Sequence, residues 1–118
     1  MEGGAWAHPA GAPKPVELDF TFGSGASQIL KGLVPGTVIK CVTVKITTPF
    51  SGGTGRTLSI GFPADNSEIA TTTQLNLTIA NMYKFDVYRT SAISETLMAY
   101  WGGTATAGAG KIIVEFTK

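Results

Sequence analysis

The residues that could do acid–base or metal chemistry are few and widely spaced in this 118-residue chain. There is one histidine, His8, and one cysteine, Cys41, which argues against a histidine-based triad, a cysteine zinc site and an intrachain disulfide. A glycosidase would need two carboxylates about 5–9.5 Å apart, and no spacing in the sequence places such a pair. We therefore expect no catalytic residues and no enzyme activity. The carboxylates are Glu2, Glu17, Asp19, Asp65, Glu68, Asp86, Glu95 and Glu115.

Asp65, Asn66 and Glu68 form a short cluster of oxygen donors that a calcium ion could use. Their spacing does not match an EF-hand loop, and Asp-Asn is ordinary turn chemistry. Cys41 lies in the most apolar stretch of the chain, where a small buried core residue is expected. The sequence therefore predicts no metal site and no cofactor.

The charge balance also limits the choice of partner. Nine Lys and Arg against eight Asp and Glu give a net charge of +1, which argues against a nucleic-acid binder. No apolar run approaches the ~20 residues of a membrane span, and no secretory signal is apparent. Only 14% of the residues are charged, below the usual ~25%. We therefore expect no nucleic acid and no membrane as partner, and part of the surface covered by another protein.

Residues 1–15 differ in composition from the rest of the chain. Gly, Ala and Pro dominate this segment, which shows no hydrophobic periodicity. We predict an extended N-terminal arm over residues 1–15 that lies on another subunit, followed by one domain over residues 16–118. Trp6 is the large side chain that could anchor the arm, and His8 and Pro9 are the other predicted contacts.

From residue 16 onward, apolar residues alternate with polar ones, as in half-buried strands. The expected strands are 16–22, 27–33, 38–48, 58–62, 75–79, 83–88, 97–101 and 111–117. Residues 64–73 are expected to form a polar connection. The apolar phase changes near Cys41, which predicts a bulge or burial of both faces there. Val34-Pro35-Gly36-Thr37 fits a type II turn.

About eight short strands without a helical stripe predict an all-β fold. We expect an antiparallel β-sandwich of jelly-roll type, with an up-and-down barrel as the alternative topology. Aromatic residues fall on both faces of the late strands, more than one core needs. These aromatic residues can be explained without a binding function, as core filling and cross-strand pairing. The functional explanations are a subunit interface and a sugar-stacking platform. The predicted interface residues of the sandwich are Tyr88, Tyr100, Trp101 and Ile113.

Four stretches of the chain together suggest a family. They are 33–39 running into 42–50, Leu58-Ser59-Ile60-Gly61 after a Gly-rich turn, Leu75-Asn76-Leu77-Thr78 before an aromatic strand, and 104–111 leading into 112–116. In order and spacing, residues 33–118 resemble small structural proteins of tailed bacteriophages, of the capsid decoration (cement), head-fibre and tail-fibre types. The chain departs from that pattern at Ala80-Asn81, where the relatives tend to have a Gly in the turn.

This resemblance implies a jelly-roll protein that assembles as a homotrimer on the virion. The expected function is capsid decoration: the protein binds the major capsid protein at the capsid surface and stabilises the shell through its sandwich and arm. The alternative is a fibre or knob protein that binds a host receptor or glycan, with Tyr88, Tyr100 or Trp101 exposed to stack on sugars. A small glycan-processing enzyme is a third hypothesis, which requires two converging carboxylates in a groove.

Overall fold

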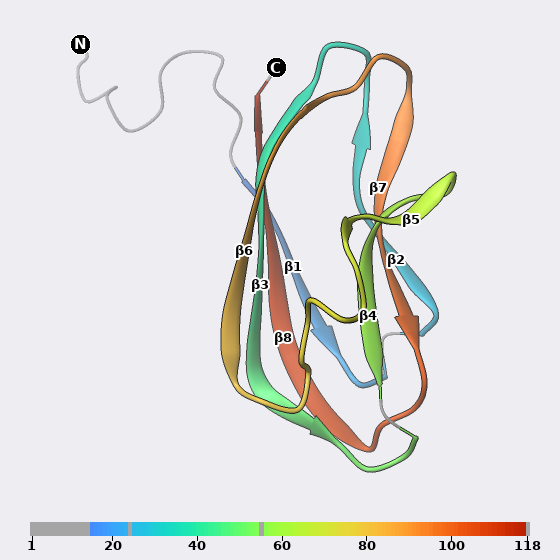
Figure 1. The fold of residues 1–118 in the computed structure, drawn as a ribbon, viewed down its shortest axis with the longest axis vertical. Coiled ribbons are helices and arrows are strands. Elements are labelled where there is room, and N and C mark those ends of the chain that lie inside the picture. Colours follow the sequence, from blue (N-terminus) through green and yellow to red (C-terminus); the bar gives the residue numbers. More distant parts are fainter. Residues whose placement is uncertain (1–14, 24, 55, 118) are drawn as a thin grey trace, which may run out of the picture.

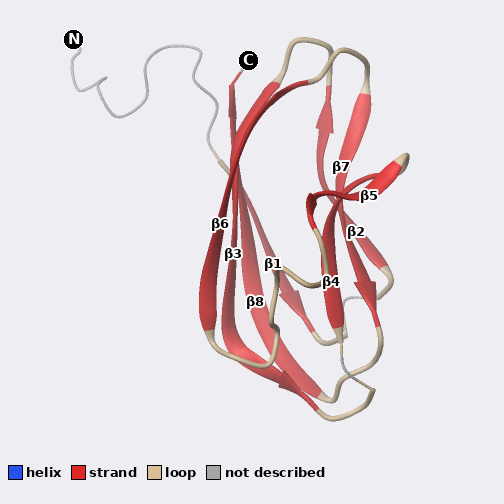
Figure 2. Cartoon of the chain, in the orientation of Figure 1, coloured by secondary structure: helices blue, strands red, loops and turns tan. Residues whose placement is uncertain are grey.

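The computed structural model describes residues 15–117 apart from residues 24 and 55, and this part of the chain contains eight strands and no helix (Figures 1 and 2). The predicted all-β class is therefore correct. The strands are β1 (Val16–Thr21), β2 (Ser27–Leu33), β3 (Val38–Ser51), β4 (Thr57–Phe62), β5 (Asp65–Ala70), β6 (Asn81–Thr90), β7 (Glu95–Gly102) and β8 (Ala107–Thr117).

The strands form two antiparallel four-stranded sheets that face one another (Figure 1). One sheet has the order β1-β8-β3-β6 and the other has the order β2-β7-β4-β5. An up-and-down barrel would pair every strand with the next in sequence, whereas here β4 and β5 are the consecutive strands that pair. The other connections between successive strands cross from one sheet to the other. This is the topology of a jelly roll.

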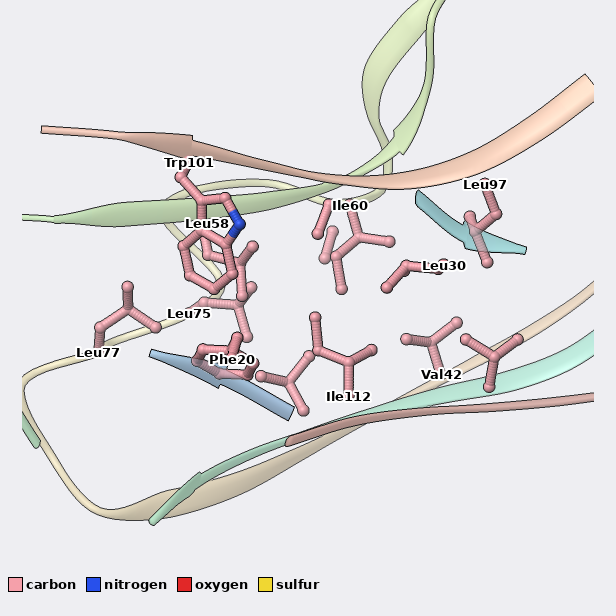
Figure 3. Close-up of a cluster of buried hydrophobic side chains, with 14 of the residues drawn as sticks. Phe20, Leu30, Val42, Leu58, Ile60, Leu75, Leu77, Leu97, Trp101 and Ile112 are labelled. Atoms are coloured by element: carbon pink, nitrogen blue, oxygen red, sulfur yellow. The ribbon is translucent and has the colours of Figure 1, made fainter. Parts of the chain in front are cut away.

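The core fills the space between the sheets, as the alternation predicts. Even-numbered residues of β1, of β8 and of β3 from Val42 to Ile46 point inward, and Val42 faces Val114 in one such row. Figure 3 shows Phe20 of the first sheet and Trp101 of the second directed toward each other, with ring centroids 4.8 Å apart. Because these rings come from opposite sheets, their contact fastens the two sheets together at this end of the core.

Two glycines of β8 make room for this aromatic cluster. A Cβ at Gly108 would collide with the Phe50 ring, and Gly108 has a φ of 141°. A Cβ at Gly110 would collide with the Lys45 carbonyl and the Phe20 ring. The strand expected at 111–117 therefore begins earlier, and β8 starts at Ala107.

The predicted strand at 75–79 is wrong, although Leu75 and Leu77 are both buried in the core. The side chain of Asn76 accepts hydrogen bonds from the backbone N–H and hydroxyl of Thr78, which satisfies these groups locally and stabilises a turn. The eighth strand is instead β5, in the segment expected to be a polar connection. Its polar sequence fits an edge strand, and its register with β4 has only two paired positions.

Two local predictions are confirmed. The register of β3 with both of its neighbours shifts between Ile39 and Cys41, so a bulge lies where the apolar phase changes. Gly36 has a φ of 93°, and the N–H of Thr37 donates to the carbonyl of Val34 over 3.1 Å, as in a type II turn. This turn is tied to residues 91–94 by two backbone hydrogen bonds between Ser91 and the residues Gly36 and Thr37.

The start of β1 and the end of β8 lie side by side. Val16 pairs with Val114 in the antiparallel ladder, and both strands reach the same end of the sandwich (Figure 1). The predicted arm therefore leaves from the sheet β1-β8-β3-β6. Residues 1–14, which include Trp6, His8 and Pro9, lie outside the described residues.

Candidate interaction surface

The carboxylates expected on solvent-facing strand positions are found there. Glu17, Asp19 and Asp86 are exposed, and Glu115 is half-buried on the same outer face. Asp65 accepts a hydrogen bond from the backbone N–H of Ser67, as in an Asx turn. Within residues 15–117, leaving out 24 and 55, no three His, Cys, Asp or Glu side chains gather as metal ligands.

A cleft of about 330 Å³ lies between β5 and β6 and is lined by Glu68, Ile69, Asp86, Val87 and Arg89. Two carboxylates therefore line one groove, which the enzyme hypothesis requires. Glu68 accepts a hydrogen bond from Nε of Arg89, so this carboxylate is held as an acceptor. A glycosidase needs two carboxyl groups that act on the substrate, and here Glu68 is engaged by Arg89 in an ion pair.

Arg89 joins the two sheets at this cleft. Its Nη1 and Nη2 donate to the two carboxylate oxygens of Glu95 over 2.6 and 3.3 Å, and its guanidinium lies 4.1 Å from the centroid of the Phe62 ring. The hydrogen bond from Arg89 lowers the pKa of Glu95, against a smaller opposing effect of burial. The cluster is therefore best explained as a structural ion-pair network between β6, β5 and β7.

Cys41 is buried, but it does not belong to the core cluster. It pairs in register with Glu115 of β8 and Asp86 of β6, two residues of the outer face. Burial and the neighbouring Glu115 raise the pKa of the thiol. The interpretation of Cys41 as a core residue is therefore corrected to a covered position on the outside of this sheet, because the bulge at Lys40 shifts its phase.

The predicted interface residues occupy different parts of the molecule. Tyr100 is half-buried on the outer face of β7, whereas Trp101, the next residue, is only 8% exposed and lies in the core. Ile113 is half-buried on the outer face of β8, between Glu17 and Thr43. Trp101 packs on Phe20 and Phe50, so we do not keep it among the proposed interface residues.

Tyr88 is the most exposed large hydrophobic residue of the described chain, with 69% of its surface accessible. Its φ is 46°, a left-handed conformation that costs a bulky residue energy. It lies in the irregular part of β6 between Arg89 and Asp86, opposite the bulge in β3. Tyr88 and Tyr100 belong to different sheets and Trp101 is buried, so these aromatic residues do not form a common shelf for stacking on a sugar.

The outer faces of the two sheets differ sharply in charge. We call the outer side of β1-β8-β3-β6 the charged face, because Glu17, Ile113, Thr43 and Lys84 form one row across it and further charged residues follow in the neighbouring rows. Lys111 is ion-paired there with Glu17 over 3.1 Å. The charged residues of this face are Glu17, Asp19, Lys45, Lys84, Asp86, Lys111 and Glu115.

The outer side of β2, β7 and β4 carries none of the four charged residue types, and we call it the uncharged face. One row across it is Ser27, Tyr100 and Ser59, and the next is Ile29, Met98 and Gly61. Charged residues of β2 and β7 turn elsewhere: Lys31 lies over the Phe116 ring and Glu95 binds Arg89. The outward residues are Ser27, Ile29, Gly32, Thr57, Ser59, Gly61, Thr96, Met98, Tyr100 and Gly102.

One side of the uncharged face is raised by β5. A Cβ at Gly61 would collide with backbone atoms of Asp65, Asn66 and Glu68, so this backbone lies directly on the outer side of Gly61. Figure 1 shows β5 projecting outward from its sheet. The shortage of charged residues seen in the sequence is thus greatest on this face, which β5 covers at Gly61 of β4. This face could not be found from a pattern of aliphatic residues in the sequence, because its outward residues are mostly Ser, Thr and Gly.

Comparison with known proteins finds no family model and no curated protein that matches this chain. Solved structures do match. A chain in the acid-stable capsid structure of Helicobacter pylori bacteriophage KHP30 has a TM-score of 0.72 at 13% identity, over 89% of this chain and 86% of that one. A chain in the capsid asymmetric unit of cyanophage Pam1 has a TM-score of 0.64 at 13% identity, over 93% and 88%. The jelly-roll fold is therefore shared with chains of these phage capsids.

The described part of the chain contains no helix that is long and apolar enough to cross a membrane.

Proposed function

We propose that this protein is a non-enzymatic decoration protein of a bacteriophage head. It binds the assembled shell of the major capsid protein at the virion surface and does so as a homotrimer. The observation that carries this proposal is the jelly-roll likeness to chains in two phage capsid structures, which covers 86 and 88% of those chains. Those chains are therefore single sandwiches of similar length.

The distribution of surface residues supports a binding role. Exposed apolar side chains lie at the end of the sandwich where the turns 34–37 and 91–94 meet, with Val34 52% and Ile93 65% exposed. Tyr88 lies three residues before the second of these turns and is held in a strained conformation. Strain of this kind is often found at functional sites. We propose Tyr88 and Ile93 as contacts to the shell.

The mechanism is stabilisation by mass action. A protein that binds the closed lattice but not its separated parts raises the free energy of shell opening by RT ln(1 + [L]/Kd) for each site. At a hundredfold excess of free protein over Kd, this amounts to about 2.7 kcal/mol. Many sites on one head therefore give a large total effect from a small protein and a modest affinity.

The test uses phage heads purified without this protein. Heads are mixed with the protein, pelleted, and analysed for bound copies and for the temperature at which they release DNA. We expect saturable binding and a higher release temperature. Ile93→Asp should weaken binding at least about tenfold, because a charge would be buried at the contact.

Ile79→Asp is the matched control. Ile79 is 54% exposed and precedes β6, whereas Ile93 follows the end of β6, so the two substitutions introduce the same charge at opposite ends of one strand. Binding by Ile79→Asp should equal that of the parent protein. Heads that neither bind the protein nor gain thermal stability would contradict the proposed function.

A further inference from the structure

We infer that the uncharged face of one copy binds the N-terminal arm of a neighbouring copy, with Trp6 seated against Ile29, Met98 and Tyr100. The inference goes beyond the proposed function, because it concerns contacts among copies of this chain in the absence of any shell. It joins the outer surface that carries no charged residues to the segment whose composition has little tendency to form secondary structure.

The face offers contacts suited to an indole ring. Ile29 is 64% exposed, and it pairs in register with Met98 in the middle of the face. The hydroxyl of Tyr100 lies 3.5 Å from Sδ of Met98, so an aromatic ring and a thioether already form one continuous surface. Thioethers make favourable contacts with aromatic rings. Trp6 would extend this cluster.

The small residues of the face suit an extended backbone. Ser27 is exposed and pairs with Tyr100, and Gly32 pairs with Thr96 at the other end of β2, whereas Ser59 on the other side of Tyr100 is buried. A Cβ at Gly32 would meet no atom within 4 Å, so the surface there is open. Hydroxyl groups can bind the carbonyls and N–H groups of an arm, and the low side-chain height lets the arm approach closely.

The distribution of charge favours binding of the arm to the uncharged face over binding to the charged face. Residues 3–13 of the arm contain no Asp, Glu, Lys or Arg. Covering the uncharged face with such a segment buries no formal charge from either partner. Covering the charged face would remove water from seven charged side chains without supplying new ion partners, which is costly.

The arm is joined to the sandwich at the sheet opposite the uncharged face. Val16 begins β1 in the sheet β1-β8-β3-β6, and the uncharged face belongs to the opposite sheet (Figure 1). Trp6 precedes Val16 by ten residues, a reach of at most about 35 Å. An arm that binds the next copy makes a heterologous contact, which closes into a ring when the rotation between copies permits. A trimer is one such ring.

The experiment uses the full chain with Trp101→Phe. Trp6 and Trp101 are the two tryptophans, so this variant leaves Trp6 as the only indole reporter. Sedimentation velocity and acrylamide quenching of Trp6 fluorescence are measured over the same range of protein concentrations. We expect Trp6 to become shielded, with at least about threefold weaker quenching, over the concentrations at which oligomers form.

Ile29→Glu and Met82→Glu in that background separate the two faces. Ile29 and Met82 are 64 and 60% exposed, and Met82 lies on the charged face beside Lys45. Ile29→Glu should weaken association at least about tenfold and leave Trp6 open to quencher, whereas Met82→Glu should behave as the parent. Deletion of residues 1–14 should abolish association, and far-UV circular dichroism confirms that each variant is folded.

Several results would overturn the inference. Shielding of Trp6 in a monomer at all concentrations would show that the arm binds its own sandwich. Equal association by the parent and Ile29→Glu would show that another surface joins the copies, and Trp6 shielded only after addition of heads would assign the arm to the shell. Because no heads are present in the main measurement, its failure is distinguishable from failure of the proposed function.

Discussion

Arg89 of β6 donates from Nη1 to Oε2 of Glu95 in β7 over 2.6 Å, so one ion pair links the two sheets at the end that carries the turns 34–37 and 91–94. The side chains are 27 and 13% exposed, which leaves this pair less screened by water than the pair of Lys111 and Glu17 on the charged face. Removing one partner of a partly buried ion pair costs more stability than removing one partner of an exposed pair, because the remaining charge is left away from water.

Glu95 should make the protein sensitive to acid. Its pKa is lower in the folded chain than the unfolded value of 4.5, so the ionised group contributes stability fully above that value and loses it as the pH falls through the folded-state pKa. Glu95→Gln should cost about 1 kcal/mol at pH 7 and less at pH 2, where more of the Glu95 carboxyl group is protonated. Urea unfolding at both pH values measures this difference. Glu17→Gln, on the exposed pair with Lys111, should leave the stability at pH 7 nearly unchanged.

Gly110→Ala should destabilise the fold by about 1–3 kcal/mol, because the added methyl group would collide with the Lys45 carbonyl and the Phe20 ring. Gly32→Ala provides the control, since a Cβ there meets no atom within 4 Å and the φ of Gly32 is not positive. Thermal unfolding of the two variants compares them directly. Equal melting temperatures would contradict the close packing of Phe20 on β8.

At position 88 a glycine should give a more stable protein than a β-branched residue. At a φ of 46°, Tyr88→Val should be less stable than Tyr88→Gly by about 1–2 kcal/mol, the reverse of the order expected in a regular strand. Chemical denaturation gives both values. If Tyr88→Val is the more stable variant, the left-handed conformation at this position is not maintained in solution.

Trp101→Phe should be tolerated better than Trp101→Ala. The indole N–H has no hydrogen-bond partner within the described chain, so Phe loses only part of the packing on Phe20 and Phe50. Truncation to Ala should cost about 3–5 kcal/mol, and Phe less than half of that. Urea unfolding followed by far-UV circular dichroism measures both, and a similar cost for the two variants would show that the N–H does have a buried partner.

The sequence predicts the sandwich well, because alternation reports directly on the inner faces of its strands. It fails at 65–79 for a physical reason: Leu75 and Leu77 are buried in alternate positions, but Asn76 ties the backbone into a turn, while the polar β5 pairs along only one edge. It also cannot separate Tyr100 from Trp101, since adjacent residues of a strand face opposite ways and either could be the inner one. The uncharged face emerges only when register brings Ser, Gly, Ile29 and Met98 of three strands together.

The neighbouring positions of Val16 and Val114 have a consequence for protein engineering. Because β1 begins where β8 ends, a short linker could join these strands and new termini could be opened at the β4–β5 hairpin tip, Pro63-Ala64. Such a circular permutant would keep every strand pairing, and the linker would take the place of residues 1–14. A peptide or enzyme fused after residue 118 of the original chain would, by the same geometry, be displayed beside the root of the arm.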